Sequence, residues 1–192
     1  DLAKAFPLSP RDQLIENQLM SLAKSTGDYA TAAAAYHASI TALGDDAREA
    51  ARLRLAYADL VGEHLSDPPT ACDAYAQVVD VEPGNRRAVH AFARTGVELK
   101  RWDAAADAVI RYCDKREGFD DELLSILEVG AAGANAWDAL ATALGSAIDT
   151  HKLPGAVAAT FHHRLSLIHR DKRHDRPAAI KSLRRALELG GD

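Results

Sequence analysis

The amino-acid sequence predicts an all-α protein built from short helical hairpins. Alanine is abundant, whereas Phe, Trp and Tyr together make up only 6% of the 192 residues. Alanine is the best helix former. Apolar residues recur at the three- and four-residue spacing of one helix face, and no run shows the alternation of a half-buried strand. Because hydrophobic residues reach 47%, we expect a folded chain and not a disordered one.

The first helices follow a short lead-in, residues 1–9. Ser9 is a suitable N-cap and Pro10 suits the first position of a helix, so we expect the first helix to begin there. Later helices should begin and end where Asp, Gly and Pro interrupt the apolar pattern. The first five expected helices span about 10–25, 28–43, 46–65, 67–82 and 86–100.

The fourth of these helices has the clearest boundaries. Asp67 can accept hydrogen bonds from the free N–H groups of the first turn. Pro68 and Pro69 then occupy that turn, where a missing N–H costs little. Glu-Pro-Gly-Asn at 82–85 ends the helix and turns the chain.

The second half of the chain predicts five more helices. They span about 102–116, 122–130, 135–150, 155–172 and 175–189. The helix at 122–130 is expected to end early, because Gly130 and Gly133 would each cost about 1 kcal/mol relative to Ala in a helix interior. Asn135 is expected to open the helix that follows.

Every second helix carries the same pattern, a small or apolar residue followed four positions later by a larger one. Successive copies lie 34 to 39 residues apart. Such a period predicts an array of helical hairpins that bury their apolar faces against one another. The pairs are Ala32 with Tyr36, Ala71 with Tyr75, Ala105 with Val109, Leu140 with Leu144, and Ala179 with Leu183.

These residues resemble the tetratricopeptide repeat (TPR) family, which repeats a helical hairpin every ~34 residues. Gly27-Asp28-Tyr29 is similar to the turn between the two helices of the family's unit, and Pro83 to its closing proline. The residues similar to its small contact positions are Ala32, Ala71, Ala105, Ala179, Ala93 and Gly96. The chain departs from the pattern at Leu140, where the family has a small residue.

The resemblance implies a right-handed α-solenoid of about five TPR-like hairpins within residues 10–192. The hairpins would span approximately 10–43, 46–82, 86–116, 120–150 and 153–189. The chain starts at Asp1 and not at Met, and it ends at Gly190-Gly191-Asp192 directly after an apolar helix. Terminal repeats usually carry a polar outer face. We therefore expect a fragment of a longer protein, with end-to-end self-association through the exposed terminal helix as a further expectation.

The resemblance also implies a non-catalytic scaffold for protein–protein interaction. In the family the first helix of each hairpin lines a concave surface that binds segments of partner proteins. In the third hairpin that helix carries Arg87, His90, Arg94 and Glu98, which share one side. The arginines could bind a partner's carboxylate in bidentate fashion, although a solvated face with local ion pairs is the plainer interpretation. A structural or regulatory spacer within a larger protein is the alternative function.

Charge is distributed unevenly along the chain. The whole chain carries a net charge of −5. Residues 150–192 hold nine Lys or Arg and four acids, a balance of +5 that leaves −10 for the remainder. Six residues form a candidate basic patch for nucleic acid or an acidic partner: Arg164, Arg170, Lys172, Arg173, Arg176 and Arg184. Few aromatic residues lie among them, so base stacking and hence nucleic-acid binding are not favoured.

The sequence predicts no catalytic site, metal site, cofactor or small-molecule substrate. Cys72 and Cys113 are expected to be buried reduced thiols, because both lie among apolar helical neighbours. His162 and His169 share a helix side, but a metal site needs three or four converging ligands. No apolar run is long enough to span a membrane and no signal peptide is present, so we expect a cytoplasmic protein.

Overall fold

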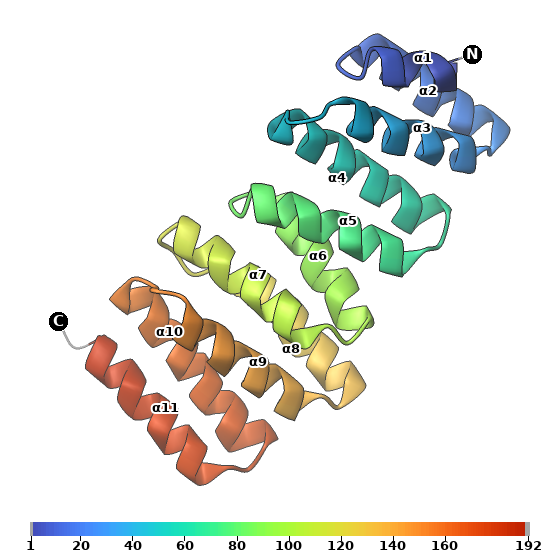
Figure 1. Cartoon of the computed structure of the whole chain (residues 1–192). Coiled ribbons are helices and arrows are strands. Elements are labelled where there is room, and N and C mark those ends of the chain that lie inside the picture. Colours follow the sequence, from blue (N-terminus) through green and yellow to red (C-terminus); the bar gives the residue numbers. More distant parts are fainter. Residues whose placement is uncertain (1, 191–192) are drawn as a thin grey trace. The chain divides into compact units, whose positions relative to one another are not determined.

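The computed structural model describes residues 2–190, and all regular elements within that range are helices. This confirms the all-α class for the described part of the chain. The protein forms two compact units, residues 1–82 and 83–192, each a stack of helical hairpins (Figure 1). The boundary falls in the Glu-Pro-Gly-Asn turn. Asp1 and Gly191–Asp192, which bear on the expectation of a fragment, lie outside the described residues.

The first unit begins with a short helix that the lead-in was not expected to form. Phe6 is buried, and its ring meets the ring of Tyr36 edge-on with centroids 5.2 Å apart. The lead-in therefore belongs to the core of this unit. The elements are α1 (Leu2–Ala5), the 3-10 helix η1 (Phe6–Leu8), α2 (Gln13–Thr26), α3 (Tyr29–Ala42), α4 (Ala47–His64) and α5 (Pro68–Val81).

The expected start of the first long helix at Ser9 and Pro10 was wrong. The Ser9 N–H donates to the carbonyl of Phe6 and so ends η1. The helix α2 begins three residues later, where the Asp12 carboxylate accepts hydrogen bonds from the N–H groups of Leu14 at 2.9 Å and Ile15 at 3.3 Å. The N-cap of α2 is therefore Asp12 and not Ser9.

The second unit carries the other three hairpins. Within it α6 packs against α7 and α8, α7 packs against α9, and α10 packs along α11. The elements are α6 (Arg86–Glu98), α7 (Trp102–Lys115), α8 (Asp121–Ala134), α9 (Trp137–Thr150), α10 (Gly155–Leu167), the π-helical turn η2 (Ile168–Lys172) and α11 (Arg176–Leu189).

The helix α8 is longer than its glycines suggested. It continues through Gly130 and Gly133 to Ala134. Asn135, expected to open the next helix, instead ends α8 as a C-cap with a φ of 50°. Asparagine tolerates this left-handed backbone better than most residues. Both expected boundaries were therefore wrong here, because tertiary packing outweighed the helix propensity of glycine.

Small residues permit close helix crossings at two hairpins. A Cβ atom built on Gly62 would lie 3.3 Å from the Cβ of Ala71, and one built on Gly96 would lie 3.3 Å from the Cβ of Ala105. Both alanines are fully buried. They are two of the small residues that the repeat pattern singled out, so the predicted contact positions are confirmed for these two hairpins.

The repeat pattern fails in the last helix. The first four pairs of the pattern are buried, from Ala32 with Tyr36 to Leu140 with Leu144. In α11 the buried positions are Ser182 and Ala186, whereas Leu183 is exposed. The expectation that Leu183 fills space between helices was wrong, because no further helix of the described chain covers that side of α11.

Candidate functional site

A groove of about 440 Å³ lies between α6 and α8, the first helices of two successive hairpins in the second unit. Three of the four residues that the sequence proposed for partner binding line it. The complete lining is His90, Arg94, Val97, Glu98, Glu122, Ser125, Ile126, Val129 and Gly130. We call this feature the α6/α8 groove.

The two helices that form the groove run in the same direction. At their N-terminal ends the Arg86 guanidinium donates to Asp120 Oδ2 at 3.0 Å and to Glu122 Oε2 at 2.6 Å. Further along both helices, Gly130 meets the side chain of Val97. The groove therefore has a charged end beside Arg86 and an apolar end beside Val97.

Gly130 explains how the helices approach at the apolar end. A Cβ atom at this position would lie 2.0 Å from Cγ1 of Val97, a distance that real contacts do not reach. Any side chain at residue 130 would displace the side chain of Val97 or push α8 away from α6. The glycine is thus required by the close approach of a neighbouring helix, one of the uses for which glycine is suited.

The floor of the groove exposes apolar side chains. Val129 is 73% exposed, and Val97 and Ile126 beside it are half-buried. A large apolar side chain exposed singly is ordinary, but three that line one hollow form a surface that a partner can cover. Burial of such a surface stabilises a complex by roughly 25 cal/mol per Å² before the costs of association.

Charged groups of both signs border this floor. Arg94 and Glu98 lie one turn apart on α6, are exposed, and make no ion pair with any residue in the range 2–190. An arginine followed four residues later by a glutamate is the less favourable orientation for pairing within one helix. These two side chains are consequently available to groups of opposite charge on a partner.

The structure places the four predicted residues unequally. His90, Arg94 and Glu98 line the groove, and His90 Nε2 lies 4.0 Å from Glu122 Oε1. Arg87 is exposed but does not line the groove, and it already interacts with other groups. The sequence missed the whole α8 side, because a helix's own periodicity does not say which neighbouring helix faces it.

Ion pairs engage half of the candidate basic patch. Arg164 donates to Glu128 at 2.8 Å and to Asp121 at 3.0 Å, and Arg170 pairs with Asp171 at 2.6 Å. Arg173 pairs with Asp138 at 2.5 Å. These carboxylates reduce the positive potential that a phosphate backbone requires.

The remaining three members of the patch, Lys172, Arg176 and Arg184, make different contacts. The Lys172 ammonium lies 5.3 Å from the centroid of the Trp137 ring, a cation–π distance. Arg176 and Arg184 are exposed and form no ion pair with any residue between 2 and 190. Of the patch, these two cations are therefore ready to meet an external anion.

The cysteines and histidines offer little chemistry in the described part of the chain. Cys72 and Cys113 are both buried and unpaired, as expected, and burial raises the pKa of the Cys113 thiol to about 11. Burial also lowers the pKa values of His162 and His169 below the ordinary value. Residues 2–190 contain no cluster of three metal-ligating side chains, and no helix among them is long and apolar enough to cross a membrane.

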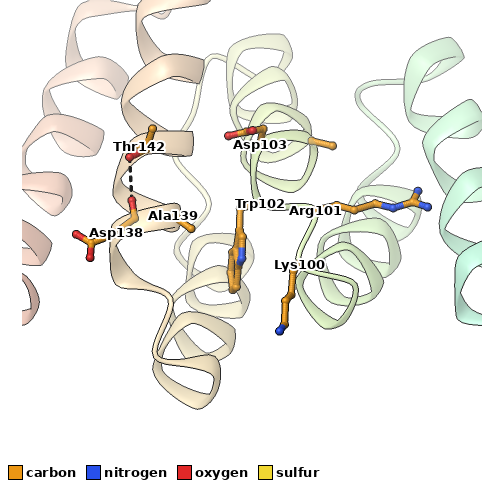
Figure 2. Close-up of a pocket in the computed structure, with 8 residues that line it drawn as sticks. Lys100, Arg101, Trp102, Asp103, Asp138, Ala139 and Thr142 are labelled. Carbon is orange, nitrogen blue, oxygen red and sulfur yellow. Dashed lines mark hydrogen bonds between the residues drawn. The ribbon is translucent and has the colours of Figure 1, made fainter.

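A larger hollow of about 560 Å³ lies where α7 and α9 begin (Figure 2). The buried Trp102 indole stands between the two helices there. Within α9, Thr142 Oγ1 donates a hydrogen bond to the Asp138 carbonyl. The rest of the lining is Lys100, Arg101, Asp103, Ala104 and Ala139. Trp102 thus serves helix packing. Because this hollow exposes no large apolar side chain, we favour the α6/α8 groove as the candidate site.

Comparison with known proteins places the fold but not the function. No family model matches the chain, and no curated protein matches it. Among solved structures, this chain is similar to the crystal structure of MamA protein. The match covers 93% of this chain and 91% of the MamA chain, with a TM-score of 0.51 and 17% sequence identity. MamA contains tetratricopeptide repeats. At this identity the likeness shows the fold alone, so the chain has a TPR-like helical-repeat fold.

Proposed function

We propose that this chain is a divergent member of the TPR family and acts as a non-catalytic module for protein–protein interaction. In this proposal a segment of a partner protein binds in the α6/α8 groove. The observation that carries the proposal is the exposed apolar floor around Val129, bordered by the unpaired charges of Arg94 and Glu98. The TPR-like fold supports it, since helical-repeat folds present extended surfaces for binding.

The groove favours a partner with a particular order of side chains. An apolar side chain would cover Val97, Ile126 and Val129. A carboxylate within one helical turn of it would pair with Arg94, in bidentate geometry where the approach allows. A basic side chain on the other side would pair with Glu98. Charged groups at such a rim set specificity and the rate of association more than affinity.

Selection from a displayed library of peptide segments on the immobilised chain tests this proposal. The dissociation constants of the selected segments are then measured for the wild type and for two variants, Val129→Ser and Arg94→Glu. Both residues are exposed, so the variants should fold normally. We expect each to weaken binding by about tenfold or more, which corresponds to about 1.4 kcal/mol.

A matched control separates this groove from the basic patch. Arg176→Glu makes the same charge change at an exposed arginine of the same unit, outside the groove. It should leave binding of the selected segments unchanged. Binding that is lost in Arg176→Glu and retained in Arg94→Glu would move the site to the basic patch. A library that yields no segment at all would favour the alternative function, a structural spacer within a larger protein.

A further inference from the structure

The outer side of α11 carries a row of apolar side chains that nothing in the described chain covers. Ile180, Leu183 and Leu187 are 53%, 43% and 68% exposed. The opposite side of the helix packs against α10 and η2 through its buried residues Ser182 and Ala186. The exposed row therefore cannot turn inward without breaking the hairpin that holds α11.

Charges beside this row repeat the arrangement on α6. On α11, Arg184 is followed four residues later by Glu188, as Arg94 is followed by Glu98 on α6. Residues four apart lie on the same helix side. Leu187 stands directly before Glu188 just as Val97 stands before Glu98. The two helices thus present the same sequence of an arginine, an apolar residue and a glutamate.

Two such helices complement each other when they run in opposite directions. In that orientation Arg184 meets Glu98 while Glu188 meets Arg94, and the apolar row of α11 meets the floor of the groove. We propose that α11 of a second copy of this chain docks antiparallel to α6 in the α6/α8 groove. This inference rests on the proposed function of that groove and names the occupant as the same protein.

The groups involved are free to make these contacts. Arg184 forms no ion pair with any residue from 2 to 190. Glu188 pairs with Arg185 at 3.0 Å, but both side chains are exposed, and an exposed pair of this kind contributes little stability and exchanges readily. The charge pattern therefore gives the docking its direction, and the apolar row gives it most of its buried surface.

The contact is heterologous, because a helix of one copy enters a groove of the next. Each copy has both surfaces, so association need not stop at two chains and can continue into open chains unless the geometry closes a ring. The contact should weaken with added salt, since its charges lie at a solvated rim. Apolar docking without the charge pairs would be insensitive to salt.

Sedimentation velocity of the full chain over a wide range of concentrations tests the proposal. The wild type should self-associate. Arg184→Glu and Glu98→Arg each place like charges opposite one another, and each should weaken association by about tenfold or more. An equimolar mixture of the two variants should regain association, because the glutamate introduced in one copy then faces the arginine introduced in the other. Circular dichroism of each variant establishes that it is folded.

The remaining outcomes overturn the proposal. A wild type that stays monomeric at all concentrations shows that a second copy does not occupy the groove. Association that survives both single variants, or that the mixture does not restore, shows that another interface is used. Neither result contradicts the proposed function, which is tested separately: segments selected from a library should bind to the monomer, and Val129→Ser should weaken that binding. Leu14→Ser, at an exposed apolar residue of the first unit, should leave self-association unchanged.

Discussion

At the scale of single residues, the glycines of α8 have different surroundings. Gly130 is in contact with Val97, whereas a Cβ atom at Gly133 would meet nothing within 4 Å. Both glycines reduce helix propensity by about 1 kcal/mol relative to Ala. Only at Gly130 does the missing side chain allow a close approach of α6.

Substitution by alanine should change the free energy of unfolding in opposite directions at the two glycines. Gly133→Ala should raise the free energy of unfolding by up to about 1 kcal/mol through helix propensity. Gly130→Ala should lower it by about 1–3 kcal/mol, because the new methyl group overlaps Val97. Urea unfolding of both variants measures this difference. A Gly130→Ala variant as stable as Gly133→Ala would mean that α6 and α8 are not in contact there.

The alanines at the hairpin crossings should tolerate little enlargement. Ala105→Leu forces a larger side chain against Gly96 and should lower the free energy of unfolding by about 1–3 kcal/mol. Ala71→Leu should do the same against Gly62. Ala104→Leu, at the exposed neighbour on the same helix, is the matched control and should change stability by less than about 0.5 kcal/mol. Equal melting curves for Ala105→Leu and Ala104→Leu would refute the crossing.

At the scale of elements, capping side chains define where most helices begin. Asp12, Asp28, Asp46, Asp67, Asn85, Asp120 and Asp175 each accept a hydrogen bond from a backbone N–H of the first turn. Asp120 has a second role, because it also accepts from Arg86 and so ties the start of α8 to the start of α6. The hydrogen bond from Arg86 holds the pKa of Asp120 below its ordinary value.

Asp120→Asn should separate the two roles of this residue. Asparagine is also a good N-cap, but it loses the ion pair with Arg86. A carboxylate with a lowered folded pKa contributes stability above its unfolded pKa and loses it as pH falls through the folded pKa. We expect the variant to be less stable than the wild type by up to about 1 kcal/mol near neutral pH.

This difference should shrink at an acidic pH below about 3.9, the ordinary pKa of aspartate, because the wild-type carboxylate becomes protonated as the pH falls through its lowered folded pKa. Urea unfolding at the two pH values checks the expectation. A difference that is constant with pH would show that the cap, and not the charge, accounts for the effect. Asp120→Ala, which removes both roles, should be less stable than Asp120→Asn at either pH.

The sequence predicted where long helices lie better than where they end. Helix starts with an aspartate cap, such as Asp67, could be predicted because the signal is local. The start at Ser9 and Pro10 was wrong, since Ser9 ends the 3-10 helix η1 and Asp12 caps α2. The end of α8 was wrong because Gly130 is stabilised by a contact with another helix, which no local pattern reports.

At the scale of the whole molecule, three of the nine residues that line the candidate site followed from the sequence. The resemblance placed His90, Arg94 and Glu98 on a first helix, and the structure places them in a groove. The apolar floor contributed by Ile126 and Val129 did not follow, because it depends on how far one hairpin is displaced from the next. An exposed apolar terminal helix did follow from the sequence, but the position of Leu183 on its exposed side did not, because the repeat pattern placed that residue between helices.

The central claim is that the α6/α8 groove is where this chain binds a partner segment. Methyl-selective NMR of valine and isoleucine, recorded while a library-selected segment is added, tests it most directly. The account predicts that the methyl signals of Val97, Ile126 and Val129 shift and saturate together, while those of the buried Val89 and Val109 change little. Saturable binding that leaves the signals of Val97, Ile126 and Val129 unmoved would contradict it.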